Sequence, residues 1–144
     1  MKRLIIITAL FISFVSFAQQ RDRSFDAFWP SFRAAVLAFD VQALDQLVSY
    51  PLTVKGTMDS DPVKKINRDK IIATLKIYFS KYAMIDDADL TETNLGQIKR
   101  YVNLPQSIYK HFSQADVVIS VGDLDFKKIG GKWRLSIIYI SSID

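Results

Sequence analysis

Few side chains in this sequence have the chemistry of a general acid or base. His111 is the single histidine, which excludes sites built from two histidines. It stands beside Lys110 in a short β-like run, where a surface position is the favoured interpretation. Asp116 begins the next β-like run, and the alternation of that run directs its side chain to the inner face. A turn residue is nevertheless the simpler interpretation of Asp116. His111 and Asp116 are therefore weak candidates for a catalytic base.

The other carboxylates favour structural roles. Asp123 and Asp125 alternate with Lys127, which predicts an outward, charge-paired surface completed by Arg134. Asp40 is predicted to cap a helix. The acidic residues between 86 and 92 depart from an EF-hand loop, since glycine and acid are missing from its sixth and twelfth positions. Without a zinc spacing, a phosphate loop or a nucleophile elbow, neither a metal nor a cofactor is expected.

Aromatic side chains are the other candidates for a site. The residues that could line the mouth of a small-molecule cavity are Trp29, Tyr50, Tyr101, Trp133 and Tyr139. They are considered because the walls of such cavities are mostly apolar. The same residues recur at helix and strand spacings, so burial in the core is the alternative interpretation.

Two helices are predicted before the first strand. Ser24 is a suitable N-cap for the first helix, whose apolar stripe consists of Phe25, Phe28, Phe32, Ala35 and Phe39. Pro30 interrupts this stripe and predicts a kink or a restart. Asp40 begins a second, short helix, which Pro51 ends, because proline disfavours helical geometry at the residue before it. Residues 52–56 then have the pattern of a short strand.

A third helix and a long hairpin are predicted to follow. Asn67 is expected to cap a helix whose apolar stripe runs from Ile71 to Tyr82. Two short β-like runs, 97–104 and 107–112, come next. The last two runs of the sequence flank Gly130 and Gly131, a pair that suits the turn of a tight β-hairpin.

The hairpin predicts two different faces. Pairing of Phe126 with Leu135 directs one set of side chains to the helices: Val118, Ser120, Leu124, Phe126, Trp133, Leu135, Ile137 and Tyr139. The opposite face then carries an apolar patch far from the turn, made of Val117, Ile119, Val121, Ile138 and Ile140. Such a patch needs a cover, which is either another part of the chain or another subunit.

Residues 1–18 are predicted to be a secretory signal peptide. A basic start precedes an uncharged run from Leu4 to Phe17, and the small residues Ser16 and Ala18 suit cleavage after Ala18. The run has 14 residues, whereas crossing a bilayer takes about 20. Cleavage leaves residues 19–144 as a single domain without a membrane anchor.

Charge and cysteine content limit the partners and the cellular location that are expected for this domain. The formal charge of +4 falls on cleavage, because Lys2 and Arg3 leave with the signal. No basic stripe with interleaved aromatics is present, so nucleic acid is not an expected partner. The absence of cysteine excludes disulfides, thiol chemistry and a lipid-modified N-terminal cysteine. The predicted product is a periplasmic or secreted protein.

The order of elements resembles a known superfamily. The stretch "FWPSFRAAVLAFDVQALDQLVSYPLTVKG" resembles the opening of nuclear transport factor 2-like proteins, and "GDLDFKKIGGKWRLSIIYI" is similar to their closing strands. The resemblance implies an α+β fold, with three N-terminal helices on a curved, mainly antiparallel sheet that forms a cone. Members often pair through the outer face of the sheet, so a homodimer through the apolar patch is expected.

Three functions are compatible with these observations. The leading hypothesis is a non-catalytic exported domain that holds a small apolar or amphipathic ligand in its cone. The second follows from the resemblance, since the superfamily includes isomerases and dehydratases; Asp116 or His111 would be the base and a tyrosine the proton donor. The third is an interaction module whose apolar outer patch binds a partner protein in the cell envelope.

Overall fold

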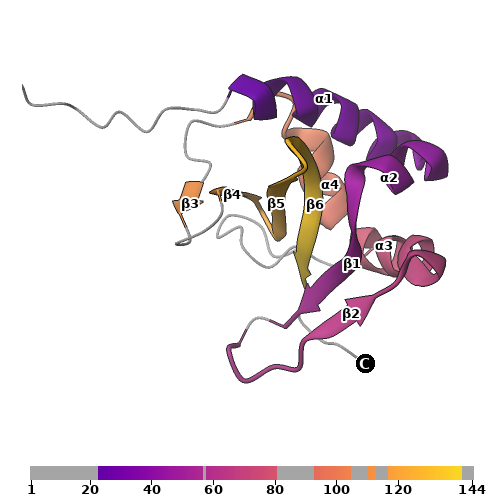
Figure 1. Ribbon diagram of the computed structural model, residues 1–144. Helices are drawn as coiled ribbons and strands as arrows, with labels where there is room; N and C mark the ends of the chain where they lie inside the picture. Colours follow the sequence, from indigo (N-terminus) through magenta and orange to yellow (C-terminus); the bar gives the residue numbers. More distant parts are fainter. Residues whose placement is uncertain (1–22, 57, 81–92, 105–109, 113–116, 141–144) are drawn as a thin grey trace, which may run out of the picture.

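The computed structural model describes residues 23–56, 58–80, 93–104, 110–112 and 117–140. The chain has an α+β fold in which helices cover one face of a six-stranded sheet (Figure 1). The helices are α1 (Arg23–Ala38), α2 (Val41–Leu47), α3 (Ile71–Ser80) and α4 (Asn94–Arg100), with a 3₁₀ turn at Arg68–Lys70. The α+β class predicted from the sequence is confirmed.

The strands follow the spatial order β2-β1-β6-β5-β4-β3. They are β1 (Val48–Lys55), β2 (Lys64–Ile66), β3 (Lys110–Phe112), β4 (Val117–Val121), β5 (Leu124–Ile129) and β6 (Lys132–Tyr139). The described pairs are antiparallel except for β1 with β6, which run parallel. This pair places the first strand of the chain beside the last.

Helix α1 carries the predicted aromatic stripe, but Pro30 does not interrupt it. Phe25, Trp29 and Phe32 are buried, whereas Pro30 is exposed. A proline inside a helix removes one backbone hydrogen bond, and the buried neighbours on both sides hold the helix in place, so it continues to Ala38. Ser24 lies within the helix instead of at its N-cap, and its hydroxyl accepts a hydrogen bond from Trp133 Nε1 at 2.9 Å.

The junction between α1 and α2 is a tight reversal. Phe39 has a positive φ of 49°, and the N–H groups of Phe39 and Asp40 donate to the carbonyl oxygens of Val36 and Ala35. This is a Schellman motif, which satisfies carbonyl groups at the end of a helix. The Asp40 carboxylate then accepts hydrogen bonds from two N–H groups in the first turn of α2. The predicted helix cap at Asp40 is confirmed.

Strand β1 begins earlier than predicted. Val48 is both the C-cap of α2, with an extended backbone at φ −106° and ψ 145°, and the first residue of the strand. Pro51 lies within the strand, so the prediction that Pro51 ends the helix is wrong. Pairing of Val48 with Leu135 of β6 sets the extended backbone before the proline is reached.

A turn that the sequence prediction missed reverses the face of β4. Residues 117–129 form two strands joined at Gly122 and Asp123, and Gly122 has a positive φ of 55° that favours glycine. Across this two-residue turn Ile119 lies opposite Phe126. Odd-numbered residues of β4 therefore share a face with even-numbered residues of β5, because paired residues point to the same side of a sheet.

A bulge in β6 changes, for a second time, which residues point to the core and which point to the outer face. Strands β5 and β6 pair as predicted near their turn, but Leu124 lies opposite Ile138 instead of Ile137, because Ser136 is an extra residue. The predicted apolar outer patch is therefore wrong. Its members all pack in or against the core, and they are Val117, Ile119, Val121, Ile138 and Ile140.

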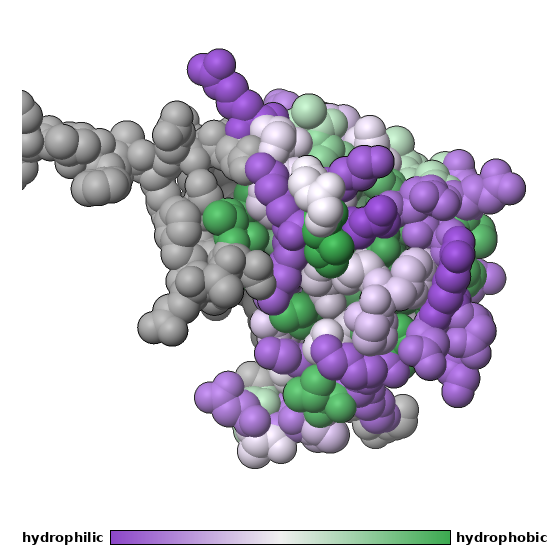
Figure 2. Space-filling model, in the orientation of Figure 1, coloured by the Kyte–Doolittle hydropathy of each residue, from purple (hydrophilic) through white to green (hydrophobic). Residues whose placement is uncertain are grey.

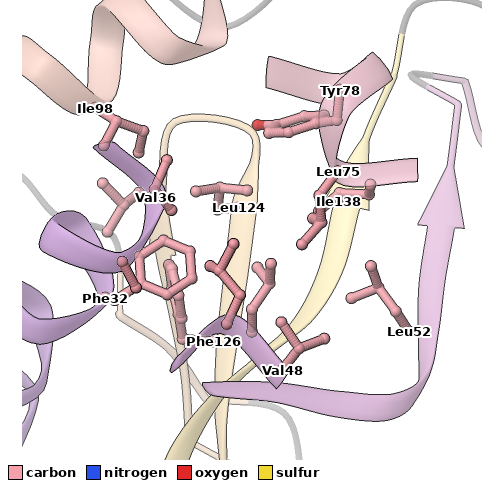
Figure 3. Packing of buried hydrophobic residues seen from close by; sticks show 14 of the residues in the cluster. Phe32, Val36, Val48, Leu52, Leu75, Tyr78, Ile98, Leu124, Phe126 and Ile138 are labelled. Carbon is pink, nitrogen blue, oxygen red and sulfur yellow. The ribbon is translucent and has the colours of Figure 1, made fainter. Parts of the chain in front are cut away.

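The core lies between the helices and the inner face of the sheet (Figure 3). Phe126 of β5 is fully buried among the aromatic side chains of α1. Its ring centroid lies 5.0 Å from that of Phe32 and 5.2 Å from that of Phe25, with edge-to-face geometry in both pairs. Such pairs add to the free energy of burial, so this cluster holds α1 across the sheet.

The middle of the chain differs most from the prediction. The first half of residues 97–104, predicted to be β-like, belongs to helix α4, whose N-cap Thr93 accepts a hydrogen bond from the N–H of Gly96. Strand β2 was not predicted, whereas β3 confirms a strand within 107–112. Asn67 precedes a 3₁₀ turn and makes no capping hydrogen bond. Tertiary contacts support α4, since Arg33 Nε donates to Ile98 O at 2.9 Å.

Candidate functional site

The helix-free face of the sheet carries an open groove of about 390 Å³. Its polar wall consists of Ser49, Tyr50, Thr53, Lys55, Lys65, Lys127 and Ser136, and its apolar wall of Pro51, Val63, Ile129 and Ile137. Figure 2 shows one side of the molecule as hydrophilic and pale side chains with isolated hydrophobic ones between them. The volume is at the lower end of the range of small-molecule sites, which begins at about 300 Å³.

Two irregularities of the sheet build this groove. The bulge in β6 allows the consecutive residues Ser136 and Ile137 both to line it, whereas regular strands alternate their side chains. Strand β1 also shifts its register against β6, between Val48 and Thr53, and Tyr50 lines the groove within this segment. The groove therefore presents more side chains than a regular sheet surface would.

The charged side chains of the groove are all positive. Lys65 Nζ donates to Thr53 Oγ1 at 2.7 Å, which fixes this ammonium group over β1. Lys55 and Lys127 are half-buried, and no ion pair joins either of them to another described residue. Among the described residues that line the groove there is no acidic side chain. Like charges at close range repel, so an anion in the groove would be stabilised.

Several hydroxyl groups of the groove donate to the protein itself. Ser49 Oγ donates to Leu135 O at 3.1 Å, and Ser136 Oγ lies 3.3 Å from Arg134 O. A hydroxyl has one hydrogen to donate, so these groups offer a ligand acceptor lone pairs. The Thr53 hydroxyl accepts from Lys65 and keeps its hydrogen for another partner. Donors for an anion are therefore the lysines and Thr53.

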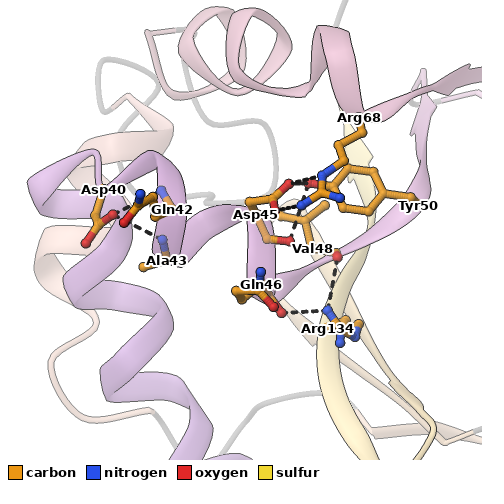
Figure 4. Close-up of polar contacts among 9 residues, drawn as sticks. All are labelled: Asp40, Gln42, Ala43, Asp45, Gln46, Val48, Tyr50, Arg68 and Arg134. Carbon is orange, nitrogen blue, oxygen red and sulfur yellow. Dashed lines mark hydrogen bonds and ion pairs between the residues drawn. The ribbon is translucent and has the colours of Figure 1, made fainter.

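Tyr50 is held at the rim of the groove by a carboxylate (Figure 4). Its hydroxyl donates to Asp45 Oδ1 at 2.6 Å, and Arg68 forms a two-point ion pair with the same carboxylate. Hydrogen bonding by Arg68, and then by Tyr50, lowers the pKa of Asp45 below its ordinary value. Burial, and then the hydrogen bond to Asp45, raises the pKa of Tyr50 to about 12. Tyr50 is therefore neutral at physiological pH.

Asp125 belongs to a hydrogen-bonded cluster on the same face of the sheet, outside the groove. Its carboxylate accepts from Ser120 Oγ at 2.5 Å and from Tyr139 OH at 3.0 Å. Burial, and then the charge of Asp125, raises the pKa of Tyr139 to about 12. The predicted salt-bridged surface is wrong for Asp125, which is buried, because hydroxyl groups satisfy it in place of Lys127.

A second polar cluster is buried between α3, α4 and the β4–β5 turn. Asp123 is buried here, which corrects its predicted outer position. Burial, and to a smaller extent the charge of Asp123, raises the pKa of Tyr78 well above its ordinary value; Figure 3 shows the Tyr78 ring pointing toward the strand of Leu124. Asn94 Nδ2 donates to Tyr78 O at 2.8 Å, while Asn94 Oδ1 and Gln97 Nε2 have no hydrogen-bond partner.

The aromatic residues proposed from the sequence lie in different places. Trp29 and Trp133 are core residues, whose indole N–H groups donate to Tyr101 O and Ser24 Oγ, both at 2.9 Å. Tyr101 is half-buried at the end of α4, and Tyr139 lies on the outer face beside Asp125. Of the five, Tyr50 is the one that lines the groove.

The lysines of the groove were missed by sequence reasoning. The positions of Lys127 and Ile129 agree with the alternation of side chains in β5. Neither strand β2, which carries Lys65, nor the bulge at Ser136 has a clear pattern in the sequence. His111 lies on β3, which is one of the two edge strands of the described sheet. Asp116 and the signal peptide at 1–18 lie outside the described residues.

The described residues also bear on metal binding and on membrane insertion. They contain no group of three His, Cys, Asp or Glu side chains that could hold a metal ion. In the same residues, no helix combines the length and hydropathy needed to cross a membrane.

Comparison with known proteins gave no relative. No protein-family model matches the chain, and neither the curated proteins nor the solved structures contain a significant match.

Proposed function

We propose that this protein is a non-catalytic binding domain that holds a small amphipathic molecule in the groove on the outer face of its sheet. The observation that carries this proposal is the groove itself, in which aliphatic, hydroxyl and lysine side chains from β1, β2, β5 and β6 line about 390 Å³. We place the ligand there instead of inside a cone, because Phe25, Trp29 and Phe32 fill the space between α1 and the sheet.

The proposed setting is the periplasm or the extracellular medium. The sequence of residues 1–18 supports this, since it has the three regions of a signal peptide. We further propose that residues 19–144 form one domain of the nuclear transport factor 2-like type, with a cone-like curvature of the sheet. The element order in the two quoted stretches and the placement of the helices on one face of the sheet support this assignment.

A binding titration followed by NMR tests the groove. The exported protein, labelled with ¹⁵N, is titrated with octanoate and with octyl glucoside below their micelle-forming concentrations. Binding of either probe in the groove is expected to shift the amide signals of β1, β5 and β6 around Thr53, Lys127 and Ile137. Shifts confined to other parts of the chain, or none with either probe, would contradict the proposed function.

A pair of matched variants separates groove contacts from general surface hydrophobicity. Ile129→Thr removes apolar surface from the groove, where Ile129 is 47% exposed. Ile77→Thr makes the same change on α3, where Ile77 is 55% exposed. We expect probe binding to weaken severalfold in the first variant and to stay unchanged in the second, because only the first residue contacts the proposed ligand.

An isomerase- or dehydratase-type enzyme is the second candidate. The observation that favours it is the buried carboxylate of Asp123, whose charge raises the pKa of the buried Tyr78 phenol in addition to the larger effect of burial. A carboxylate can remove a proton next to a carbonyl group while a neutral phenol donates a hydrogen bond to the oxygen. The test is conversion of 3-cyclohexen-1-one to its conjugated isomer, followed by ultraviolet absorbance. A rate that equals that of buffer, or that Asp123→Asn leaves unchanged, would exclude this role.

The interaction module and the homodimer stay predictions with less support than before. Both rested on an apolar outer patch whose residues pack in or against the core. A homodimer through the outer face would now have to cover the groove, so a second copy and a ligand would compete for this face.

A further inference from the structure

We infer that the ligand of the groove is an anionic amphiphile, whose carboxylate or phosphate head group is held by Lys55, Lys65 and Lys127. This inference rests on the proposed function and names its ligand class. Three ammonium groups line one groove, and none of the other described residues that line it is acidic. Such an arrangement is repulsive when empty and complementary to a negative charge.

The lysines are available to a ligand. Lys55 and Lys127 are half-buried, with no ion pair to another described residue. Lys65 uses one of its three N–H donors on Thr53 Oγ1 and keeps the others. By contrast, Arg68 is paired with Asp45, and Arg134 Nη1 donates to Gln46 O at 2.5 Å. The three lysines of the groove therefore keep N–H donors for an anion.

The hydroxyl groups strengthen the assignment to the lysines. Tyr50 and Ser49 donate their hydrogens to Asp45 and Leu135, so neither supplies a donor to an anion. The Thr53 hydroxyl, which accepts from Lys65, can donate to the same head group.

Apolar side chains beside the lysines make the ligand an amphiphile instead of a simple ion. Val63, Ile129 and Ile137 line the same groove, and Val63 is 55% exposed. Burying exposed apolar surface is favourable at about 25 cal/mol per Å², so a short alkyl chain or a single ring would add affinity. The small volume favours such a chain over a long acyl tail.

The test compares ligands that share an octyl tail and differ in their head group. Octanoate, octyl phosphate, octyl glucoside and octylammonium are titrated against the exported protein, together with inorganic phosphate. We expect the two octyl anions to bind at least about tenfold more tightly than octyl glucoside, a difference of about 1.4 kcal/mol. Octylammonium should not bind. The ratio of octanoate to octyl phosphate affinity distinguishes a carboxylate from a phosphate head group.

Matched variants place the binding in the groove. Val63→Glu adds a carboxylate among the lysines and should weaken octanoate binding about tenfold, because it neutralises their field. Ile77→Glu makes the same change at an equally exposed position on α3 and should leave binding unchanged. Lys127→Met should weaken binding, whereas Lys99→Met on α4 should not. Circular dichroism verifies that all four variants fold.

Salt dependence provides an independent measurement. Raising the ionic strength from about 0.01 M to about 0.1 M shortens the Debye length from about 30 Å to about 10 Å. Octanoate binding should weaken over this range, while octyl glucoside binding should not.

The outcomes separate this inference from the proposed function. Equal binding of octanoate and octyl glucoside in the groove, unaffected by Val63→Glu, would overturn the anionic head group and leave the binding function intact. Inorganic phosphate that binds as tightly as octyl phosphate would overturn the contribution of the tail. If no octyl probe shifts the groove signals, the proposed function itself is wrong.

Discussion

At the scale of single residues, polar side chains in this protein pair mainly through hydroxyl and backbone groups. Asp125 is satisfied by Ser120 and Tyr139, and both indole N–H groups find oxygen acceptors. Asp45 differs from these groups, because it pairs with Arg68 and also receives the hydroxyl of Tyr50. This one carboxylate determines how Tyr50 stands at the rim of the groove.

Removing Arg68 should raise the pKa of Asp45. The hydrogen bond from Arg68 is the largest cause that lowers this pKa, and the one from Tyr50 is the second. Arg68→Met should therefore raise the pKa more than Tyr50→Phe does, as followed by NMR of the carboxyl carbon. Because the folded pKa lies below the unfolded one, the stabilisation is present above the unfolded pKa and is lost as the pH falls through the folded value. Equal effects of the two variants would contradict this ranking.

The contacts among Asp45, Tyr50 and Arg68 also predict an alkaline transition of Tyr50. Its folded pKa of about 12 lies above the ordinary value of 10.0. The corresponding stability is thus present below the unfolded pKa and is lost as the pH rises through the folded one. Asp45→Asn should lower the pKa of Tyr50, yet leave it above the ordinary value, since burial is the largest cause. Ultraviolet titration of the phenolate, with Tyr50→Phe to assign the signal, measures this.

At the scale of elements, the faces of the sheet depend on two local features, the turn at Gly122 and the bulge at Ser136. The turn reverses the parity between β4 and β5, and the bulge shifts it again within β6. Together they direct Ile119 and Ile138 to the core and Ser136 to the groove. The hairpin at Gly130 and Gly131, in contrast, follows directly from its glycines.

Glycine should matter more at the first of these turns than at the second. Gly122 and Gly130 have similar positive φ values of 55° and 56°. A Cβ at Gly122 would lie 2.6 Å from Gln97 Oε1, whereas one at Gly130 would meet nothing within 4 Å. Gly130→Ala should cost about 1 kcal/mol of unfolding free energy from backbone strain alone, and Gly122→Ala should cost more. Chemical denaturation compares them; a larger loss for Gly130→Ala would contradict the crowding at Gln97.

At the scale of the whole molecule, the packing of α1 on the inner face of the sheet determines which face is open. Phe126 contacts four aromatic rings of α1, those of Phe25, Phe28, Trp29 and Phe32. The opposite face carries the groove and its lysines. The core and the proposed binding groove therefore lie on opposite sides of one sheet.

Truncation of Phe126 tests this division. Phe126→Ala should lower the unfolding free energy by about 3–5 kcal/mol, as is usual for a buried phenylalanine. Phe126→Leu should cost clearly less, because it refills most of the volume. Chemical denaturation measures both, and a loss below about 1 kcal/mol for the alanine variant would show that the cluster does not hold α1.

Native mass spectrometry of the protein exported by its own leader tests the setting and the assembly together. We expect a mature mass that lacks residues 1–18, together with additional mass that dissociates on activation. A dimer without added mass would instead favour the outer face as a subunit interface, especially if Val63→Glu dissociates it. An unprocessed mass would contradict the predicted signal peptide.

Several features were predictable from the sequence because they depend on neighbouring residues. The aromatic stripe of α1, the cap at Asp40 and the hairpin at Gly130 and Gly131 are local signals, and the structure contains all three. The α+β class follows from their order. Residues 97–104 were assigned wrongly, because a helix of seven residues is too short to show its period and is held by tertiary contacts such as Arg33 with Ile98.

The candidate site, in contrast, could not be predicted from the sequence, apart from Tyr50. Lys55, Lys65 and Lys127 come from three strands, and they share one groove because β1 pairs with both β2 and β6 while β5 pairs with β6. The sequence by itself determined the elements whose signals are local, because backbone preference and hydrophobic period act over a few residues. Only the tertiary structure decided which face of each strand is buried, because one turn residue or one bulge reverses a two-residue period for everything beyond it.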